Sequence, residues 1–112
     1  MKNNTYKYGL FSEYIMIVYL FFIGYKIIAR RFKTKLGEID IIASKGDNLV
    51  IFEVKARKKE ELSTDIVSKK QINRIYGAIN IFLAQNNKYI DYNILFCIIL
   101  YKNMFNFKII KG

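Results

Sequence analysis

Residues 37–56 read GEIDIIASKGDNLVIFEVKA and carry the clearest structural signal in this chain of 112 residues. Two runs rich in aliphatic residues, 38–44 and 49–55, flank the tetrapeptide at 45–48, Lys-Gly-Asp-Asn. A Gly-Asp pair between two apolar runs is typical of a two-residue β-hairpin turn. The sequence therefore predicts two antiparallel strands joined by a tight turn.

Charged side chains interrupt both runs at positions where a buried strand would carry aliphatic residues. Because side chains alternate along a strand, Glu38 and Asp40 share one face of the first strand, and Glu53 and Lys55 share one face of the second. A two-residue turn places Asp40 opposite Glu53 and Glu38 opposite Lys55, with Cβ atoms about 4.5–5.5 Å apart. A three-residue turn would place Asp40 opposite Val54 and separate these groups.

Two interpretations fit this patch of cross-strand charges. The first is a salt-bridge ladder on an exposed sheet face. The second is a metal site, because two adjacent carboxylates repel unless a proton or a cation lies between them. A divalent cation held there keeps several waters and can activate one toward a phosphodiester, with Lys55 positioning the water or stabilising charge on the phosphate. The apolar surroundings favour the metal site, since buried charges are costly unless paired.

The composition limits the chemistry and the partners. The chain has no His, which excludes His-based triads and imidazole ligands, so oxygen ligands and Mg²⁺ or Mn²⁺ are expected rather than zinc. The net charge of +10 suits a polyanion, either nucleic acid or an anionic membrane surface. Cys97 is the single cysteine, so no internal disulfide forms and a cytoplasmic location is expected, with Cys97 buried in the core.

Hydrophobic periodicity and turn signals predict the remaining elements. Gly24 permits a chain reversal after the first helix, residues 56–64 are polar and predict a loop, and Ser68 with Gln71 forms a capping box at the start of the second helix. The order is αβββαββ, which predicts one α/β (α+β) domain over 1–112 with a central mixed five-stranded sheet flanked by helices. The predicted elements are helices over 8–22 and 68–85, and strands over 25–32, 38–44, 49–55, 92–101 and 104–110.

The uncharged apolar segment 14–25 raises the question of membrane contact. Glu13 and Lys26 bound only twelve residues, whereas a membrane span needs about 20. We expect a buried helix and no membrane partner; membrane contact or a targeting role is the alternative.

Several motifs in this chain resemble the YraN family of small bacterial proteins. The most specific are GEID at 37–40 and FEVKAR at 52–57, and the similarity extends over most of the chain. It departs from the family at Arg31, where an Asn is usual, and at Met16, where a small residue is usual. Further matching positions are Gly9, Glu13, residues 24–30, Lys70, Gln71 and residues 91–94.

The YraN family in turn resembles the PD-(D/E)xK nuclease superfamily, which has the restriction-endonuclease-like fold and includes archaeal Holliday-junction resolvases. This resemblance implies a metal-dependent endonuclease acting on phosphodiesters, with DNA favoured over RNA and branched DNA included. It assigns Mg²⁺ or Mn²⁺ to Glu13, Asp40 and Glu53, and catalysis to Asp40, Glu53, Lys55 and Gln71. Gln71 is explained equally well by the capping box. A homodimer would suit a junction, because resolving one takes two cuts.

Basic residues surround the predicted site in sequence and predict contacts with phosphates. Such contacts are independent of base sequence and weaken with salt. Two other interpretations stay open: a charge run on a merely solvated face, and a non-catalytic nucleic-acid-binding module that retains the nuclease fold. The predicted nucleic-acid-binding residues are Arg30, Arg31, Lys33, Lys35, Arg57, Lys58, Lys69, Lys70 and Arg74.

Overall fold

The computed structural model describes residues 2–56, 68–103 and 105–111, with side chains described from residue 10 onward. The predicted order of elements is confirmed, although the first helix begins at Lys2 rather than Tyr8 and a short 3₁₀ helix follows the second helix. Residues 57–64 of the predicted loop lie outside the described residues. The elements are α1 (Lys2–Phe22), β1 (Lys26–Lys33), β2 (Glu38–Lys45), β3 (Asn48–Ala56), α2 (Lys69–Gln85), η1 (Asn87–Tyr89), β4 (Asn93–Asn103) and β5 (Asn106–Lys111).

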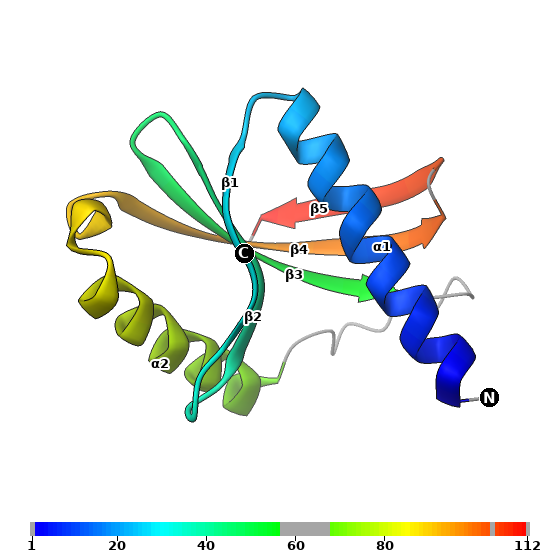
Figure 1. Cartoon of the computed structure of the whole chain (residues 1–112), viewed down its shortest axis with the longest axis horizontal. Helices are drawn as coiled ribbons and strands as arrows, with labels where there is room; N and C mark the ends of the chain where they lie inside the picture. The colour runs from blue at the N-terminus through cyan, green and yellow to red at the C-terminus, as the bar shows by residue number, and fades with distance from the viewer. Residues whose placement is uncertain (1, 57–67, 104, 112) are drawn as a thin grey trace.

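The strands form one mixed sheet in the order β1-β2-β3-β4-β5. Among the described strands, β3 and β4 pair in parallel and the other neighbours pair antiparallel. The parallel pair requires a crossover, and α2 lies within it (Figure 1). This α+β architecture, with a mixed open sheet and two α-helices, is consistent with the restriction-endonuclease-like fold that was expected.

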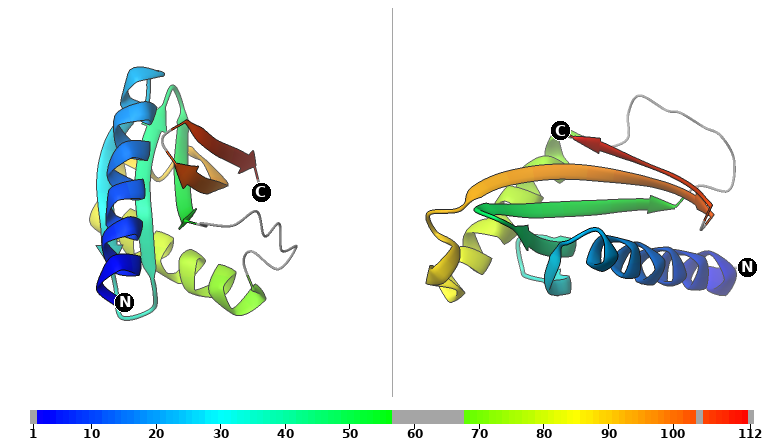
Figure 2. Two further views of the ribbon diagram at one scale, coloured as in Figure 1. Left: turned by 90° about the vertical axis from the view of Figure 1, so that its right-hand side faces the viewer. Right: turned by 90° about the horizontal axis from the view of Figure 1, so that it is seen from above.

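Each face of the sheet packs against one helix. On one face, Met16 and Leu20 of α1 join a buried cluster that contains Phe52 and the predicted buried Cys97. On the other face, α2 contributes to a second cluster through residues such as Ile79. Figure 2 shows α1 lying alongside the sheet. Because the two helices lie on opposite faces, their side chains can meet only where the sheet opens or ends.

The apolar segment 14–25 forms the second half of α1 and the turn after it. Met16 and Leu20 are fully buried, but Tyr14, Phe21 and Phe22 are exposed, so the expectation of a buried helix is correct for one face only. Gly24 adopts a φ of 103° at the chain reversal. Within the part of the chain that the structure describes, neither helix combines the length and the hydropathy needed to cross a bilayer.

Strand β2 changes direction at Asp40. Ile41 belongs to the cluster on the α1 side, whereas Ile39, two residues away, belongs to the cluster on the α2 side. Residues two apart in a regular strand share a face, so the strand twists sharply at this point. The ladder between β2 and β3 extends to the pair Ile41–Phe52, and beyond it β2 pairs only with β1 among the recorded partners. This divergence opens the sheet beside Asp40.

The loop between β1 and β2 is pressed against α2 at Gly37. The Thr34 hydroxyl accepts the Gly37 N–H at 3.0 Å, which holds the loop in a tight turn. A Cβ built on Gly37 would lie 2.5 Å from the Arg74 carbonyl oxygen and 2.9 Å from its carbon. Both atoms belong to the helix backbone, so no side-chain rotation relieves the clash.

We therefore expect Gly37→Ala to push this loop away from α2 and to lower the free energy of unfolding by roughly 1–3 kcal/mol, the usual effect of overpacking. Urea denaturation followed by circular dichroism measures this difference. A Gly37→Ala protein with wild-type stability would mean that the loop is not in contact with α2.

Candidate functional site

A cavity of about 580 Å³ opens where β2 leaves β3, bounded by α1, the β1–β2 loop and the start of α2. Its charged lining brings together acidic and basic side chains from five elements, α1, β1, β2, β3 and α2. The acidic ones are Glu13, Glu38, Asp40 and Glu53, and the basic ones are Arg31, Lys70 and Arg74. Such a mixture suits a phosphate bound near a cation, since each charge finds a complement.

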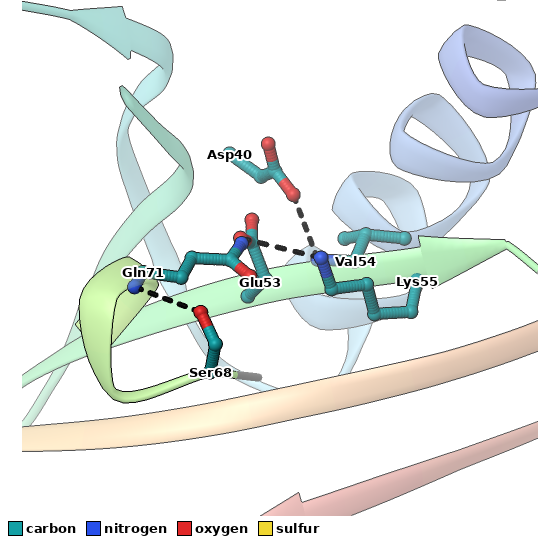
Figure 3. A network of polar contacts seen from close by, with 6 residues as sticks. All are labelled: Asp40, Glu53, Val54, Lys55, Ser68 and Gln71. Carbon is teal, nitrogen blue, oxygen red and sulfur yellow. Dashed lines mark hydrogen bonds and ion pairs between the residues drawn. The ribbon is translucent and has the colours of Figure 1, made fainter. Parts of the chain in front are cut away.

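The hairpin register that the candidate site requires is confirmed. Lys45 pairs with Asn48, so the turn contains two residues, and Gly46 adopts a φ of 60°. Continued by one step past Ile41–Phe52, this register brings Asp40 opposite Glu53. Where the backbone ladder ends, the side chain of Asp40 makes the next hydrogen bond to β3: its Oδ2 accepts the Val54 N–H at 2.8 Å (Figure 3). Asp40 is thereby fixed in position by the backbone of β3.

Glu53 is held from two further directions. Its side chain is buried, with the residue 7% exposed. The side-chain amide of Gln71 donates a hydrogen bond to Glu53 Oε2, and Lys55 Nζ lies 3.9 Å from the same oxygen. Figure 3 shows Asp40, Glu53 and Gln71 pointing toward one another. Three different segments, β2, β3 and α2, therefore converge on one pair of carboxyl groups.

The contacts of Gln71 distinguish between its two predicted roles. Ser68 Oγ accepts the Gln71 N–H at 3.1 Å, so the N-cap half of the capping box is confirmed. The side chain of Gln71 bonds to Glu53 instead of returning to the N-cap. The cap thus orients the first turn of α2, and the Gln71 side chain donates its hydrogen bond to Glu53 of the carboxyl pair.

The proximity of the two carboxyl groups changes their protonation. Burial, and then the hydrogen bond and negative charge of Asp40, raise the pKa of Glu53 to about 9, while Lys55 and Gln71 act in the opposite direction. At neutral pH Glu53 therefore retains its proton. A cation bound between these oxygens would take the place of that proton.

Glu13 lies in the same cavity but has another partner. Its Oε1 is 3.6 Å from the guanidinium of Arg31, which also lies 4.0 Å from Glu38 Oε1. Burial, and then Asp40 and Glu38, raise the pKa of Glu13 to about 7, while Arg31 opposes the increase. The negative charge of Asp40 therefore raises the pKa of Glu13 even though Glu13 is paired with Arg31.

Arg31 adopts an unusual backbone conformation, with a φ of 50°. This left-handed region costs a residue with a side chain roughly 1–2 kcal/mol, and glycine or asparagine adopts it more readily than arginine. The sequence analysis predicted neither this conformation nor the pairing with Glu13 and Glu38, although the Asn that is usual at this position in the family that the chain resembles was a signal of a positive φ. These are the main features of the site that sequence reasoning missed.

The donor set suits a hard divalent cation bound by two carboxylates and water. Asp40 and Glu53 provide adjacent oxygens, and the raised pKa of Glu53 indicates that positive charge is favoured there. No group of three carboxylate or thiol side chains in the described ranges is arranged to hold a metal ion. The third predicted ligand, Glu13, therefore contributes to the field at the cavity rather than to a preformed cluster.

The remaining predicted residues differ in where the structure places them. Glu38 pairs with Lys33 across β1 and β2 rather than with Lys55, because β2 has left β3 at that point. Arg31, Lys70 and Arg74 line the cavity, whereas Lys33 and Lys35 border a separate hollow of about 330 Å³. Arg30 and Lys69 are exposed, at β1 and the start of α2, and Arg57 and Lys58 lie outside the described residues.

Comparisons with known proteins place the chain in a family. The model of the uncharacterised protein family UPF0102 matches residues 12–105. A UPF0102 protein of Rhizobium etli (strain CIAT 652) is 45% identical over 85 residues, which are 76% of this chain and 70% of the relative. A UPF0102 protein of Rhizobium leguminosarum bv. trifolii (strain WSM2304) is 46% identical over the same shares. One from Bartonella bacilliformis is 40% identical over 88 residues, 79% of this chain and 72% of the relative. The chain therefore belongs to the UPF0102 family, which is the YraN family that its motifs resemble.

Proposed function

We propose that this protein is an endonuclease that uses Mg²⁺ or Mn²⁺ to hydrolyse phosphodiester bonds of DNA, branched DNA included. The observation that carries the proposal is the pair Asp40 and Glu53, which lie side by side in a cavity also lined by three cationic side chains. Nuclease chemistry needs such a place for a divalent ion next to a place for a phosphate.

Some residues of the site would bind the ion, and others would act on the substrate. Asp40 and Glu53 would hold the divalent ion, which when bound supplies Lewis-acid chemistry and a water of lowered pKa. The Val54 N–H fixes the rotamer of Asp40, and Gln71 fixes that of Glu53. Lys55, beside Glu53, would stabilise negative charge that builds up on the phosphate.

The wall of the cavity formed by α2 supports binding of a phosphate. Lys70 and Arg74, one turn apart on the helix, both line the cavity. The first turn of α2 carries no acidic residue, so the positive end of the helix dipole and these two cations act together. Phosphate contacts of this kind position a strand without reading its bases.

The proposal is tested by cleavage of end-labelled DNA. Purified protein is incubated with linear, nicked, single-stranded and four-way-branched DNA, with Mg²⁺, with Mn²⁺ or with EDTA. We expect product with either ion and none with EDTA, because the carboxyl pair cannot activate water without a cation. Cleavage that persists in EDTA, or the absence of cleavage on every substrate with both ions, would contradict the proposal.

A second candidate function is a nucleic-acid-binding module that keeps this fold without cleaving. It is favoured by the pairing of Glu13 with Arg31, which leaves two adjacent carboxyl groups for an ion in the described part of the chain. This function predicts DNA binding that weakens steeply with salt. The same assay distinguishes the two functions, because a binding module gives retarded DNA and no product.

A further inference from the structure

Arg31 occupies a position in the cavity that its residue type does not favour. Its φ of 50° is in the left-handed region, and its guanidinium lies between Glu13 and Glu38. Strained conformations persist where the surrounding structure enforces them, and they gather at functional sites. The geometry of Arg31 therefore calls for a functional explanation beyond a surface charge.

The guanidinium neutralises an acidic cluster that a divalent ion would also neutralise. Glu13, paired with Arg31, lines the same cavity as Asp40 and Glu53, so the arginine and an ion at those two carboxylates act on one electrostatic system. The two ion-pair distances, 3.6 and 4.0 Å, are longer than the roughly 2.8 Å of a direct charge-assisted hydrogen bond. A phosphate would offer the planar fork of Arg31 closer, bidentate contacts.

We infer that Arg31 is a substrate-binding residue that exchanges carboxylate partners for a phosphate of the nucleic acid once a divalent ion neutralises the cluster. The inference rests on the proposed function of the site and adds a linkage to it. In the ion-free protein Arg31 forms ion pairs with the carboxylates, and in the ion-bound protein it forms them with a phosphate of the substrate. Ion binding and nucleic-acid binding are therefore coupled through this side chain.

The linkage predicts opposite effects when Arg31 is replaced. Arg31 and the divalent ion compete for the same negative charge, so removal of the arginine strengthens ion binding. Removal also takes away a phosphate contact, so the gain in DNA affinity that an ion produces becomes smaller. Damage to the structure would weaken both kinds of binding, and this sign difference separates a functional role from a structural one.

The experiment compares Arg31→Gln with Lys108→Gln, which removes one positive charge at an exposed residue of β5 outside the cavity. Mn²⁺ affinity is measured without DNA by the electron paramagnetic resonance signal of free Mn²⁺. DNA affinity is measured by fluorescence anisotropy with Ca²⁺ and with EDTA, Ca²⁺ being the oxygen-binding ion used in place of Mg²⁺. Arg31→Gln is expected to bind Mn²⁺ about tenfold more tightly and to lose about tenfold of the Ca²⁺-dependent gain in DNA affinity, whereas Lys108→Gln keeps both at wild-type values. Arg31→Lys, which keeps the charge without the fork, should restore wild-type Mn²⁺ affinity and only part of the DNA gain.

Identical behaviour of Arg31→Gln and Lys108→Gln in both assays would overturn the inference even if the wild type cleaves DNA. A wild-type protein that binds no Mn²⁺ would overturn it as well. Conversely, the expected opposite shifts in a protein that never cleaves would support the linkage and refute the endonuclease proposal. The two proposals can therefore fail separately.

Discussion

Replacing Asp40 with Asn is expected to reduce ion-dependent DNA cleavage by at least about 100-fold while leaving the fold intact. The carboxylate of Asp40 has two roles, as one half of the proposed ion site and as the acceptor of the Val54 N–H at 2.8 Å. The Asn side-chain oxygen can still accept that hydrogen bond, whereas it carries no charge for a divalent ion. The substitution thus separates the chemical role of Asp40 from its structural role.

Two further variants serve as controls for this prediction. Asp47→Asn makes the same chemical change in the exposed hairpin turn, outside the cavity, and should cleave like the wild type. Asp40→Ala also removes the acceptor, which leaves the Val54 N–H unpaired and should lower stability by roughly 1–3 kcal/mol. Initial cleavage rates and thermal midpoints of all three proteins are the measurements. If Asp40→Asn cleaves within a few-fold of Asp47→Asn, Asp40 does not hold a catalytic ion.

The central hairpin was predictable because its signals are local. Turn chemistry at Gly46 fixes a two-residue loop, and strand alternation then fixes which charged residues can meet. Asp40 and Glu53 could therefore be placed opposite each other from the sequence. The contacts of residues with long-range partners were harder to predict from the sequence. Gln71 was ambiguous because a capping box and a site contact share the same spacing, and only the structure shows its amide at Glu53.

The differences between prediction and structure arise where the chain leaves regular geometry. The pairing of Glu38 with Lys55 assumed a straight β2, whereas the twist at Asp40 moves Glu38 toward β1 and Arg31. Arginine itself gives no sign of the positive φ at Arg31, and only the Asn that is usual at this position in the family indicates it. The pairing of Glu13 with Arg31 depends on the packing of α1 against the sheet, which strand periodicity does not encode.

Glu53→Gln is expected to make the ion-free protein more stable at neutral and alkaline pH and to abolish cleavage. In the folded protein the pKa of Glu53 is about 9, against an ordinary value of 4.5, because of burial and the neighbouring Asp40. The folded state therefore holds this proton more tightly than the unfolded chain does. Its contribution to stability is complete below pH 4.5 and is lost progressively as the pH rises toward 9. Gln carries no proton to lose, and its oxygen can still accept the hydrogen bond from Gln71.

The expected gain of Glu53→Gln over the wild type is near zero at pH 4 and roughly 1–3 kcal/mol at pH 8. A shallower slope remains in the variant, because Glu13, with a pKa of about 7, shifts in the same direction. Urea unfolding between pH 4 and pH 9 measures both slopes, and Mn²⁺ should raise the thermal midpoint of the wild type while leaving that of Glu53→Gln nearly unchanged. If instead the variant were less stable than the wild type at pH 8 without ions, the carboxyl pair would stabilise the fold by itself. Glu53 would then need no cation, and the ladder of cross-strand charges would explain the residues better than a site for hydrolysis.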